Sequence, residues 1–160
     1  MRVAGIIKNS VVNGIGIRDV IFVQGCMHYC IGCHNSHTWK LSGGRWYSLK
    51  DLLALCTLSN NDMTISGGEP LLQYKELIEF MCIAKSQYNK HFWLYTGYTY
   101  EEIPQERLEE LAKYVDVLVD GRFEIDKKDL RLRFRGSSNQ RLIDLPKSVA
   151  NDKIILWEGN

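Results

Sequence analysis

The sequence has no long apolar run and no strong excess of either charge. No stretch reaches the ~20 apolar residues that a membrane-spanning helix needs, and the first seven residues are too short for a signal peptide. The net charge is +1, so nothing attracts the whole chain to nucleic acid or to an anionic membrane. The sequence also contains no internal repeat and no low-complexity segment. We therefore expect a protein that binds neither nucleic acid nor membrane.

The cysteines are too few and too unevenly placed for a secreted disulfide framework. There are five, an odd number, and three of them lie within eight residues. Free thiols persist in reducing compartments, so the sequence predicts a cytoplasmic protein. With 160 residues, 45% of them hydrophobic, the chain can bury one ordinary core. We expect a single domain over residues 1–160.

The clustered cysteines are Cys26, Cys30 and Cys33, in the spacing C-x3-C-x2-C. Residues 20–23 before them are typical of a buried strand, which Gly25 ends. The cysteines therefore lie in a loop at the carboxyl end of a strand, where α/β proteins place their chemistry. Three thiolates on such a loop can hold three corners of a [4Fe–4S] cluster. A closed electron-transfer cluster usually takes four cysteines, so one iron would stay open to an external ligand.

Two other interpretations of these cysteines remain open on spacing alone. A structural zinc site could take His28, His34 or His37 as its fourth ligand, since zinc accepts mixed Cys/His sets. The three thiols could also be reduced and metal-free. The remaining cysteines, Cys56 and Cys82, fall on or beside apolar stripes of predicted helices, so we interpret them as packing residues.

Strand and helix patterns alternate along the chain, which predicts a parallel sheet with right-handed crossovers. Helices are expected to begin near Ser48 and Thr99, each of which opens a capping-box pattern, and at Pro70, which suits a first helical turn. A complete eight-unit barrel needs ~250 residues, so any barrel here must be partial. The strands are expected at residues 3–8, 19–24, 63–66, 92–95, 115–119, 131–135 and 153–157, with a loop over 39–47.

Polar and small residues follow the predicted strands at their carboxyl ends. Gly67 and Gly68 let a backbone approach a ligand closely, and Glu69 follows them directly. Thr96 and Asp120 end the next two strands and should face the same opening. The alternative interpretation is a tight turn with a helix-start carboxylate at residues 67–70 and ordinary turn chemistry elsewhere.

The C-x3-C-x2-C loop after a buried strand resembles the radical S-adenosylmethionine (radical SAM) superfamily. Residues 13–18 are similar to the G-P-G-x-R segment of glycyl-radical-enzyme activases, and residues 66–70 resemble the superfamily's G-G-E motif. Residues 95–99, 117–121 and 135–141 resemble the anaerobic (class III) ribonucleoside-triphosphate reductase activating proteins. The resemblance covers nearly the whole chain, and residues 135–141 are its most specific part, because generic radical SAM proteins lack them.

The resemblance implies an α/β fold of the radical SAM type, a partial (β/α) barrel with a mainly parallel sheet. It implies that a [4Fe–4S] cluster binds S-adenosyl-L-methionine at its open iron and that one electron cleaves the sulfonium, giving methionine and a 5′-deoxyadenosyl radical. Glu69 would receive the ammonium group of this cofactor, and Arg122 could pair with its carboxylate. The cluster ligands would be Cys26, Cys30 and Cys33, and the cofactor site would comprise Gly67, Gly68, Glu69, Thr96, Asp120 and Arg122.

The partner implied by the resemblance is the large subunit of anaerobic ribonucleotide reductase, which would lose a Cα hydrogen from one glycine of its glycyl radical domain. A small reductant protein such as flavodoxin would supply the electron. The basic residues between 127 and 135 could dock a partner, although charge runs are more often solvated faces. The alternatives are an activase of another glycyl radical enzyme, a radical SAM enzyme acting on a small molecule, and a non-catalytic metal or Fe–S binding module.

One position departs from the superfamily pattern. Many members have an aromatic residue just before the third cysteine, near the adenine, and Gly32 stands there in this chain. A side chain at this position therefore cannot stack on adenine. Tyr29 and His34 are nearby candidates for that contact.

Overall fold

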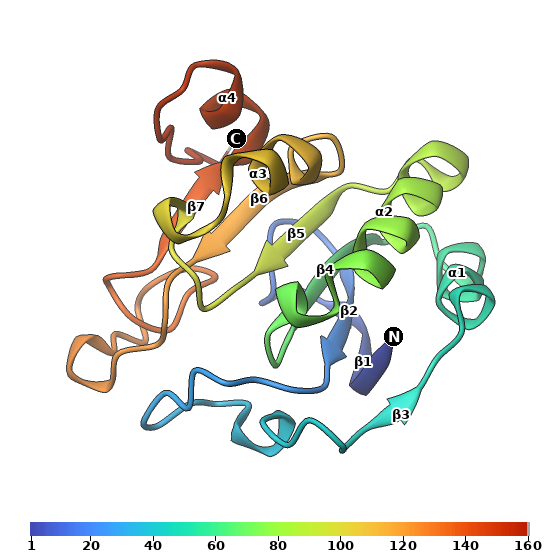
Figure 1. Ribbon diagram of the computed structural model, residues 1–160, viewed down its shortest axis with the longest axis horizontal. Coiled ribbons are helices and arrows are strands. Elements are labelled where there is room, and N and C mark those ends of the chain that lie inside the picture. Colours follow the sequence, from blue (N-terminus) through green and yellow to red (C-terminus); the bar gives the residue numbers. More distant parts are fainter. Residues whose placement is uncertain (160) are drawn as a thin grey trace.

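The computed structural model describes residues 1–159 and is built on one seven-stranded sheet with the strand order β3-β1-β2-β4-β5-β6-β7 (Figure 1). The four strands β2, β4, β5 and β6 pair in parallel, and the outer strands pair antiparallel. The sheet stays open between its edges β3 and β7, which confirms the predicted α/β partial barrel with a mainly parallel sheet. The strands are β1 (Arg2–Ser10), β2 (Arg18–Val23), β3 (Arg45–Trp46), β4 (Asp62–Gly67), β5 (Phe92–Tyr95), β6 (Val115–Asp120) and β7 (Arg141–Asp144).

The helices pack on one face of the sheet and enclose the main core (Figure 1). Ser48 starts the first helix with the predicted capping box, in which Ser48 and Asp51 exchange side-chain and backbone hydrogen bonds. Cys56 is 4% exposed within this core, which confirms its interpretation as a packing residue. Within residues 1–159, no helix has the length and apolar character needed to cross a bilayer. The helices are α1 (Leu49–Leu58), α2 (Tyr74–Tyr88), α3 (Gln105–Leu111) and α4 (Leu145–Ala150).

Two predicted strands were wrong. Residues 131–135 form turns, because the Asp129 carboxylate accepts hydrogen bonds from the backbone and side chain of Arg131 and bends the chain there. Residues 153–157 contribute only a single bridge, between Ile143 and Leu156. The predicted loop over 39–47 contains the short edge strand β3, and the elements β7 and α4 were not predicted.

Two predicted helix starts begin with a short 3-10 turn. Pro70 opens the turn Pro70–Gln73, which leads directly into α2. The capping box at Thr99 is present, but it opens the turn Tyr100–Glu102. Pro104 follows this turn, and α3 starts after it because proline cannot continue the preceding hydrogen-bond pattern.

The sheet face opposite the helices is filled by aromatic side chains. Successive residues of a strand point to opposite faces, so Phe92 and Leu94 of β5 enter the helix-side core while Trp93 enters the other face. The Trp93 ring lies 5.2 Å from that of Phe134 and 4.9 Å from that of Trp157, both edge-on. This cluster closes the inner face of the open barrel beneath the strand ends.

Arg18, the first residue of β2, ties the turn before it to the sheet. Its side chain is fully buried and donates to Thr64 Oγ1 at 2.8 Å and to the carbonyl oxygens of Met63 and His91 at 2.6 and 2.9 Å. The guanidinium also lies 5.6 Å from the Trp93 ring centre. Burial lowers the pKa of Arg18 to about 10, so the side chain is still charged at neutral pH.

We expect Arg18→Ala to lower the free energy of unfolding by about 3 kcal/mol, because it leaves buried carbonyl oxygens without a donor and opens a void beside Trp93. Urea denaturation measures the change. Lys8→Ala, at an exposed position of β1, is the control and should change stability by less than about 0.5 kcal/mol. A loss below about 1 kcal/mol for Arg18→Ala would contradict the structural role given to this residue.

Candidate functional site

The carboxyl ends of the parallel strands open into a cavity of about 770 Å³. One wall is the cysteine loop after β2, and the opposite wall is formed by residues 121–123 after β6 together with residues 129–136. The glycine turn after β4 and the end of β5 form its floor. Of the residues predicted for the site, those lining the cavity are Cys26, Cys30, Cys33, Gly67, Gly68, Thr96 and Arg122.

All three cysteines line this cavity, and backbone N–H groups lie near their sulfurs. Burial raises the pKa of the Cys26 and Cys30 thiols, while hydrogen bonds from the backbone of His28 and of Phe123 act in the opposite direction. The N–H of Asn35 donates to Cys33 Sγ at 3.4 Å. Such donors stabilise thiolates, the form in which cysteine binds iron. The residues therefore fit a cluster bound by three thiolates.

The described residues contain no preformed zinc site of cysteines and a histidine. Of the three candidate histidines, His28 lies 2.9 Å from Glu69, His34 lines the cavity and His37 does not line it. Within residues 1–159, no three side chains of His, Cys, Asp or Glu converge as they would around one metal ion. In a cubane cluster each thiolate binds a different iron, so the sulfurs need only face a common space.

The Glu69 carboxylate lies just behind the cavity floor and is 1% exposed. Its Oε1 accepts from the Leu71 N–H at 3.0 Å and from Thr96 Oγ1 at 2.9 Å. Its Oε2 accepts from the Gly97 N–H at 2.7 Å and lies 2.9 Å from His28 Nε2. A carboxylate has about four acceptor positions, and this one uses all of them within the chain. Glu69 thus joins the cysteine loop to the ends of β4 and β5.

Two glycines make this junction possible. A Cβ at Gly97 would lie 2.3 Å from Cδ2 of the His28 ring, so a side chain there would push His28 away from Glu69. A Cβ at Gly68 would lie 2.2 Å from the Gly25 carbonyl oxygen, which accepts the Glu69 N–H at 2.7 Å. Both positions therefore need glycine for close backbone approach.

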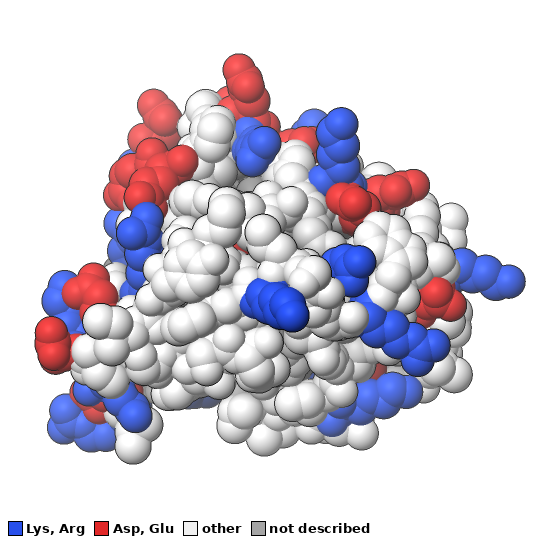
Figure 2. All heavy atoms as spheres, turned by 60° about the horizontal axis from the view of Figure 1, so that its bottom comes forward, with Lys and Arg blue, Asp and Glu red and all other residues white. Residues whose placement is uncertain are grey.

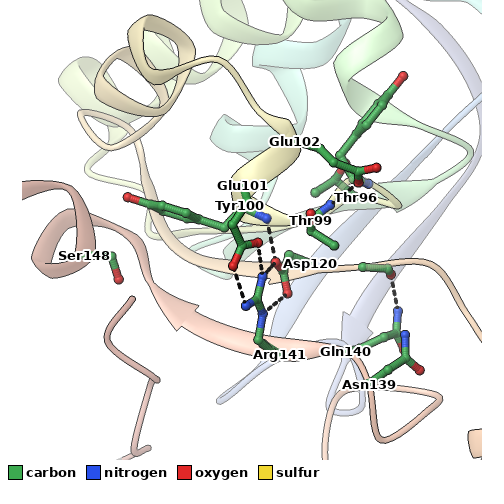
Figure 3. A network of polar contacts seen from close by, with 12 residues as sticks. Thr96, Thr99, Tyr100, Glu101, Glu102, Asp120, Asn139, Gln140, Arg141 and Ser148 are labelled. Atoms are coloured by element: carbon green, nitrogen blue, oxygen red, sulfur yellow. Dashed lines mark hydrogen bonds and ion pairs between the residues drawn. The ribbon is translucent and has the colours of Figure 1, made fainter. Parts of the chain in front are cut away.

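Asp120 does not reach the cavity, although it was predicted to contact the cofactor. Its buried carboxylate instead accepts hydrogen bonds from Arg141 and from the Tyr100 N–H, the latter at 2.7 Å (Figure 3). Arg141 also donates to both oxygens of Glu101, at 3.0 and 2.7 Å. Asp120 is turned away because a buried carboxylate needs a charged or hydrogen-bonding partner, which the following strand β7 supplies.

The segment 135–141, singled out by resemblance, braces the cavity wall after β6. Gln140 accepts from the Gly136 and Ser137 N–H groups and donates to the Gly121 carbonyl oxygen at 3.0 Å. Asn139 donates to the Arg122 carbonyl oxygen at 2.8 Å. These bonds hold residues 121–123 against the cavity, a role that the turn-like sequence alone could not show.

Of the three remaining candidate residues, two line the cavity and one does not. Arg122 lines the cavity, and its Nη2 lies 3.7 Å from Glu102. His34 lines it too, with its ring 5.2 Å from that of Phe123, whereas Tyr29 packs on Trp39 and does not line it. Phe123 also lines the cavity and was not among the predicted site residues; its only sequence signal was its position three residues after the end of β6.

Comparison with known proteins agrees with this geometry. A family model described as a 4Fe-4S single cluster domain matches residues 12–143. The anaerobic ribonucleoside-triphosphate reductase-activating protein of Enterobacteria phage T4 is 39% identical over 138 residues, covering 82% of this chain and 86% of that protein. The proteins of the same name from Vibrio cholerae and Escherichia coli K12 are 37% and 34% identical, each covering 82% of this chain and 90% of the relative.

Among solved structures, QueE from Escherichia coli superposes with a TM-score of 0.52. The match covers 94% of this chain and 67% of QueE at 17% sequence identity. A likeness at this identity concerns the fold alone, and it supports the partial barrel described above.

Replacing any one of Cys26, Cys30 and Cys33 with alanine should abolish stable cluster binding, because all three cysteines line the cavity. After anaerobic reconstitution with iron and sulfide, we expect bound iron to fall from about four atoms per chain to below about one. Cys82→Ala, a cysteine on α2 outside the cavity, is the matched control and should retain iron. Equal iron loss in the control, or full retention in Cys30→Ala, would contradict this assignment.

Arg141→Gln should lower the free energy of unfolding by about 2 kcal/mol at pH 7, because the buried Asp120 carboxylate loses its charged partner. Arg141 also lowers the pKa of Glu101 from 4.5 to about 2. Because the pKa of Glu101 is lower in the folded than in the unfolded state, the ionised Glu101 carboxylate stabilises the fold above pH 4.5. This contribution is lost as the pH falls toward 2. The stability gap between wild type and variant should therefore shrink between pH 5 and pH 2.

Urea denaturation across this pH range measures the gap. Lys75→Gln is the control, because Lys75 is an exposed cation on α2 that forms no ion pair within residues 1–159. It should change stability by less than about 0.5 kcal/mol. A gap for Arg141→Gln that stays constant or widens on acidification would contradict the network.

Proposed function

Given that the chain belongs to the family of anaerobic ribonucleoside-triphosphate reductase-activating proteins, we propose that it generates the glycyl radical of an anaerobic ribonucleotide reductase. The observation that carries the proposal is that the three cysteines, the glycine turn after β4 and the end of β5 meet in one cavity. When bound there, a [4Fe–4S] cluster and S-adenosylmethionine supply the 5′-deoxyadenosyl radical that removes a glycine hydrogen.

Cys26, Cys30 and Cys33 hold the cluster as thiolates in this proposal. The backbone N–H groups of His28, Phe123 and Asn35 stabilise the sulfur charges. Two of these donors belong to the cysteine loop, and Phe123 belongs to the opposite wall. The cluster site is therefore complete only when both walls of the cavity are in place.

Gly67, Gly68 and Glu69 would receive the amino-acid end of S-adenosylmethionine. Glu69 Oε2 would accept the ammonium group in place of His28, because the His28 side chain can move, whereas the other donor to this oxygen is the backbone N–H of Gly97. Thr96 keeps the carboxylate in position at Oε1 and Gly97 at Oε2. Arg122, which lines the cavity, would pair with the carboxylate of the cofactor. Asp120 acts indirectly, by fixing Arg141 and the turn after β5.

The cavity suits a radical that must be kept from water yet reach a protein substrate. The side chains of Phe22, Tyr95, Phe123 and Phe134 give it a largely apolar lining. The sheet is open between β3 and β7, so a glycine-bearing loop of the reductase large subunit can enter. A non-catalytic metal-binding module would need neither this lining nor the second wall.

The cluster needs one electron, which a small reductant protein such as flavodoxin supplies in this proposal.

The five cysteines of this chain form no disulfide in the described residues, which suits a reducing compartment. We therefore place the protein in the cytoplasm.

Electron paramagnetic resonance tests the proposed function. The anaerobically reconstituted protein is reduced with dithionite and measured with and without S-adenosylmethionine, then mixed with the reductase large subunit. We expect the reduced cluster signal to change shape with S-adenosylmethionine, and a glycyl radical to form on the reductase but not on a reductase whose radical glycine is alanine.

The failing outcomes separate the alternatives. A cluster signal indifferent to S-adenosylmethionine would favour the binding module. A response to S-adenosylmethionine without a glycyl radical would favour an activase of another enzyme or a small-molecule substrate.

A further inference from the structure

The cysteine loop lies in a part of the chain that lacks acidic residues. From Val20 to Lys50 there is no aspartate and no glutamate, and this stretch contains the whole loop and β3. Lys40 and Arg45 of this stretch and Arg2 of β1 are all exposed. Arg2 pairs with Trp46 across the β1–β3 ladder and donates to the Gly43 carbonyl oxygen at 3.2 Å. These three cations, Arg2, Lys40 and Arg45, lie along the β1–β3 edge of the sheet and the segment that leads to it from the cysteine loop, and we call them the basic edge.

The cations of the basic edge form no ion pair. Within residues 1–159, none of the three has a carboxylate within 4.0 Å. Hydrogen bonds from Ser48, and to a smaller extent the charge of Arg45, lower the pKa of Asp51, so this carboxylate offsets part of the Arg45 charge without pairing with it. Figure 2, which turns the cysteine-loop side of the molecule forward, shows Lys and Arg side chains gathered on the side where β3 lies in Figure 1.

The basic stretch at residues 127–135 is partly paired and partly inside the cavity. Lys127 pairs with Glu124 at 2.7 Å, and Arg131 pairs with Asp129 at 2.8 Å. Lys128, Arg133 and Arg135 form no ion pair within residues 1–159, but Arg133 and Arg135 line the cavity. Figure 2 shows positive and negative side chains mixed on the side of the molecule where this loop lies. The field of an unpaired group of cations reaches further into solvent than that of ion pairs. Of the two groups, the basic edge is thus the one whose unpaired cations all lie outside the cavity.

The basic edge is attached directly to the start of the cysteine loop. The N–H of Cys26 donates to the Trp39 carbonyl oxygen at 3.1 Å, and the Gln24 side chain donates to the Lys40 carbonyl oxygen at 2.6 Å. Trp39 lines the cavity, while none of the residues of the basic edge does. The basic edge therefore lies on the outer side of the loop that carries the cluster ligands.

Exposed apolar side chains accompany these cations. Leu41 is 56% exposed and Trp46 is 58% exposed, and both lie next to a cation in the chain. An apolar centre with a charged rim is the usual composition of a protein interface, and tryptophan is enriched among the residues that dominate binding.

We propose that the basic edge docks a small acidic electron-carrier protein, which reduces the cluster from outside the cavity. This inference rests on the proposed function, because it requires a redox-active cluster at the three cysteines. Electron transfer slows steeply with distance, so a carrier must approach the cysteine loop closely. In the step, the reduced flavin or iron–sulfur group of the carrier loses one electron and the cluster passes from [4Fe–4S]²⁺ to [4Fe–4S]⁺. The cavity stays free for the reductase loop during this contact.

The test compares charge reversal at the basic edge with the same change elsewhere. The reconstituted double variant Lys40→Glu/Arg45→Glu is mixed with flavodoxin hydroquinone at low ionic strength, and cluster reduction is followed by stopped-flow absorbance. We expect reduction at least about tenfold slower than in the wild type. The difference should disappear at about 0.5 M salt, where exposed charges are screened. Lys40→Ala/Arg45→Ala should give an intermediate rate.

The matched control is Lys113→Glu/Lys153→Glu, which reverses two exposed lysines near α3 and α4, away from the cysteine loop. It should stay within about twofold of the wild type. All variants should be reduced equally by dithionite, which needs no docking site. An equal slowing in the control, or an unchanged rate in Lys40→Glu/Arg45→Glu, would overturn the proposal.

Two further outcomes separate this proposal from the function on which it rests. If dithionite reduces no cluster in the wild type, both the proposed function and the docking surface are wrong. If Lys40→Glu/Arg45→Glu takes up electrons from flavodoxin normally but forms less glycyl radical after dithionite reduction, the basic edge belongs to the reductase and the carrier proposal is overturned.

Discussion

The site depends on one buried carboxylate. Glu69 is enclosed by the chain, and an ionised group in that position is tolerated only when its oxygens are satisfied. The donors come from the cysteine loop, from the turn after β5 and from the helical turn that Glu69 itself begins. They reach it together only when these segments take the observed positions. The same interaction that satisfies Glu69 therefore sets the spacing between the cysteines and the strand ends.

The two walls of the cavity are held by different means. The cysteine loop is fixed by backbone bonds from Gly25 and Cys26 to residues 38 and 39. The opposite wall has no regular structure, and side chains of residues 139–141 hold it from outside. Rigid strands below and loops above are a common arrangement for sites that need both precise geometry and access for a large substrate.

Charge is distributed unevenly around this site. Arg141 connects Asp120 and Glu101 in a compact network, and Lys127 and Arg131 pair with Glu124 and Asp129. The outer side of the cysteine loop has cations without such partners. A protein whose net charge is only +1 thus presents a locally positive surface beside its chemical centre.

The sequence by itself determined the parallel strands, the position of each motif at a strand end and the cysteine spacing. Local patterns suffice for these, because buried strands and capping boxes depend on neighbouring residues. The tertiary structure alone decided which polar residues meet. Asp120 and Thr96 both end strands, yet β7 supplies Arg141 to the first and Glu69 binds the second. Residues 131–135 alternate like a strand, but Asp129 and the Phe134 packing on Trp93 turn them back. Contacts between residues far apart in the chain follow from packing, which periodicity does not encode.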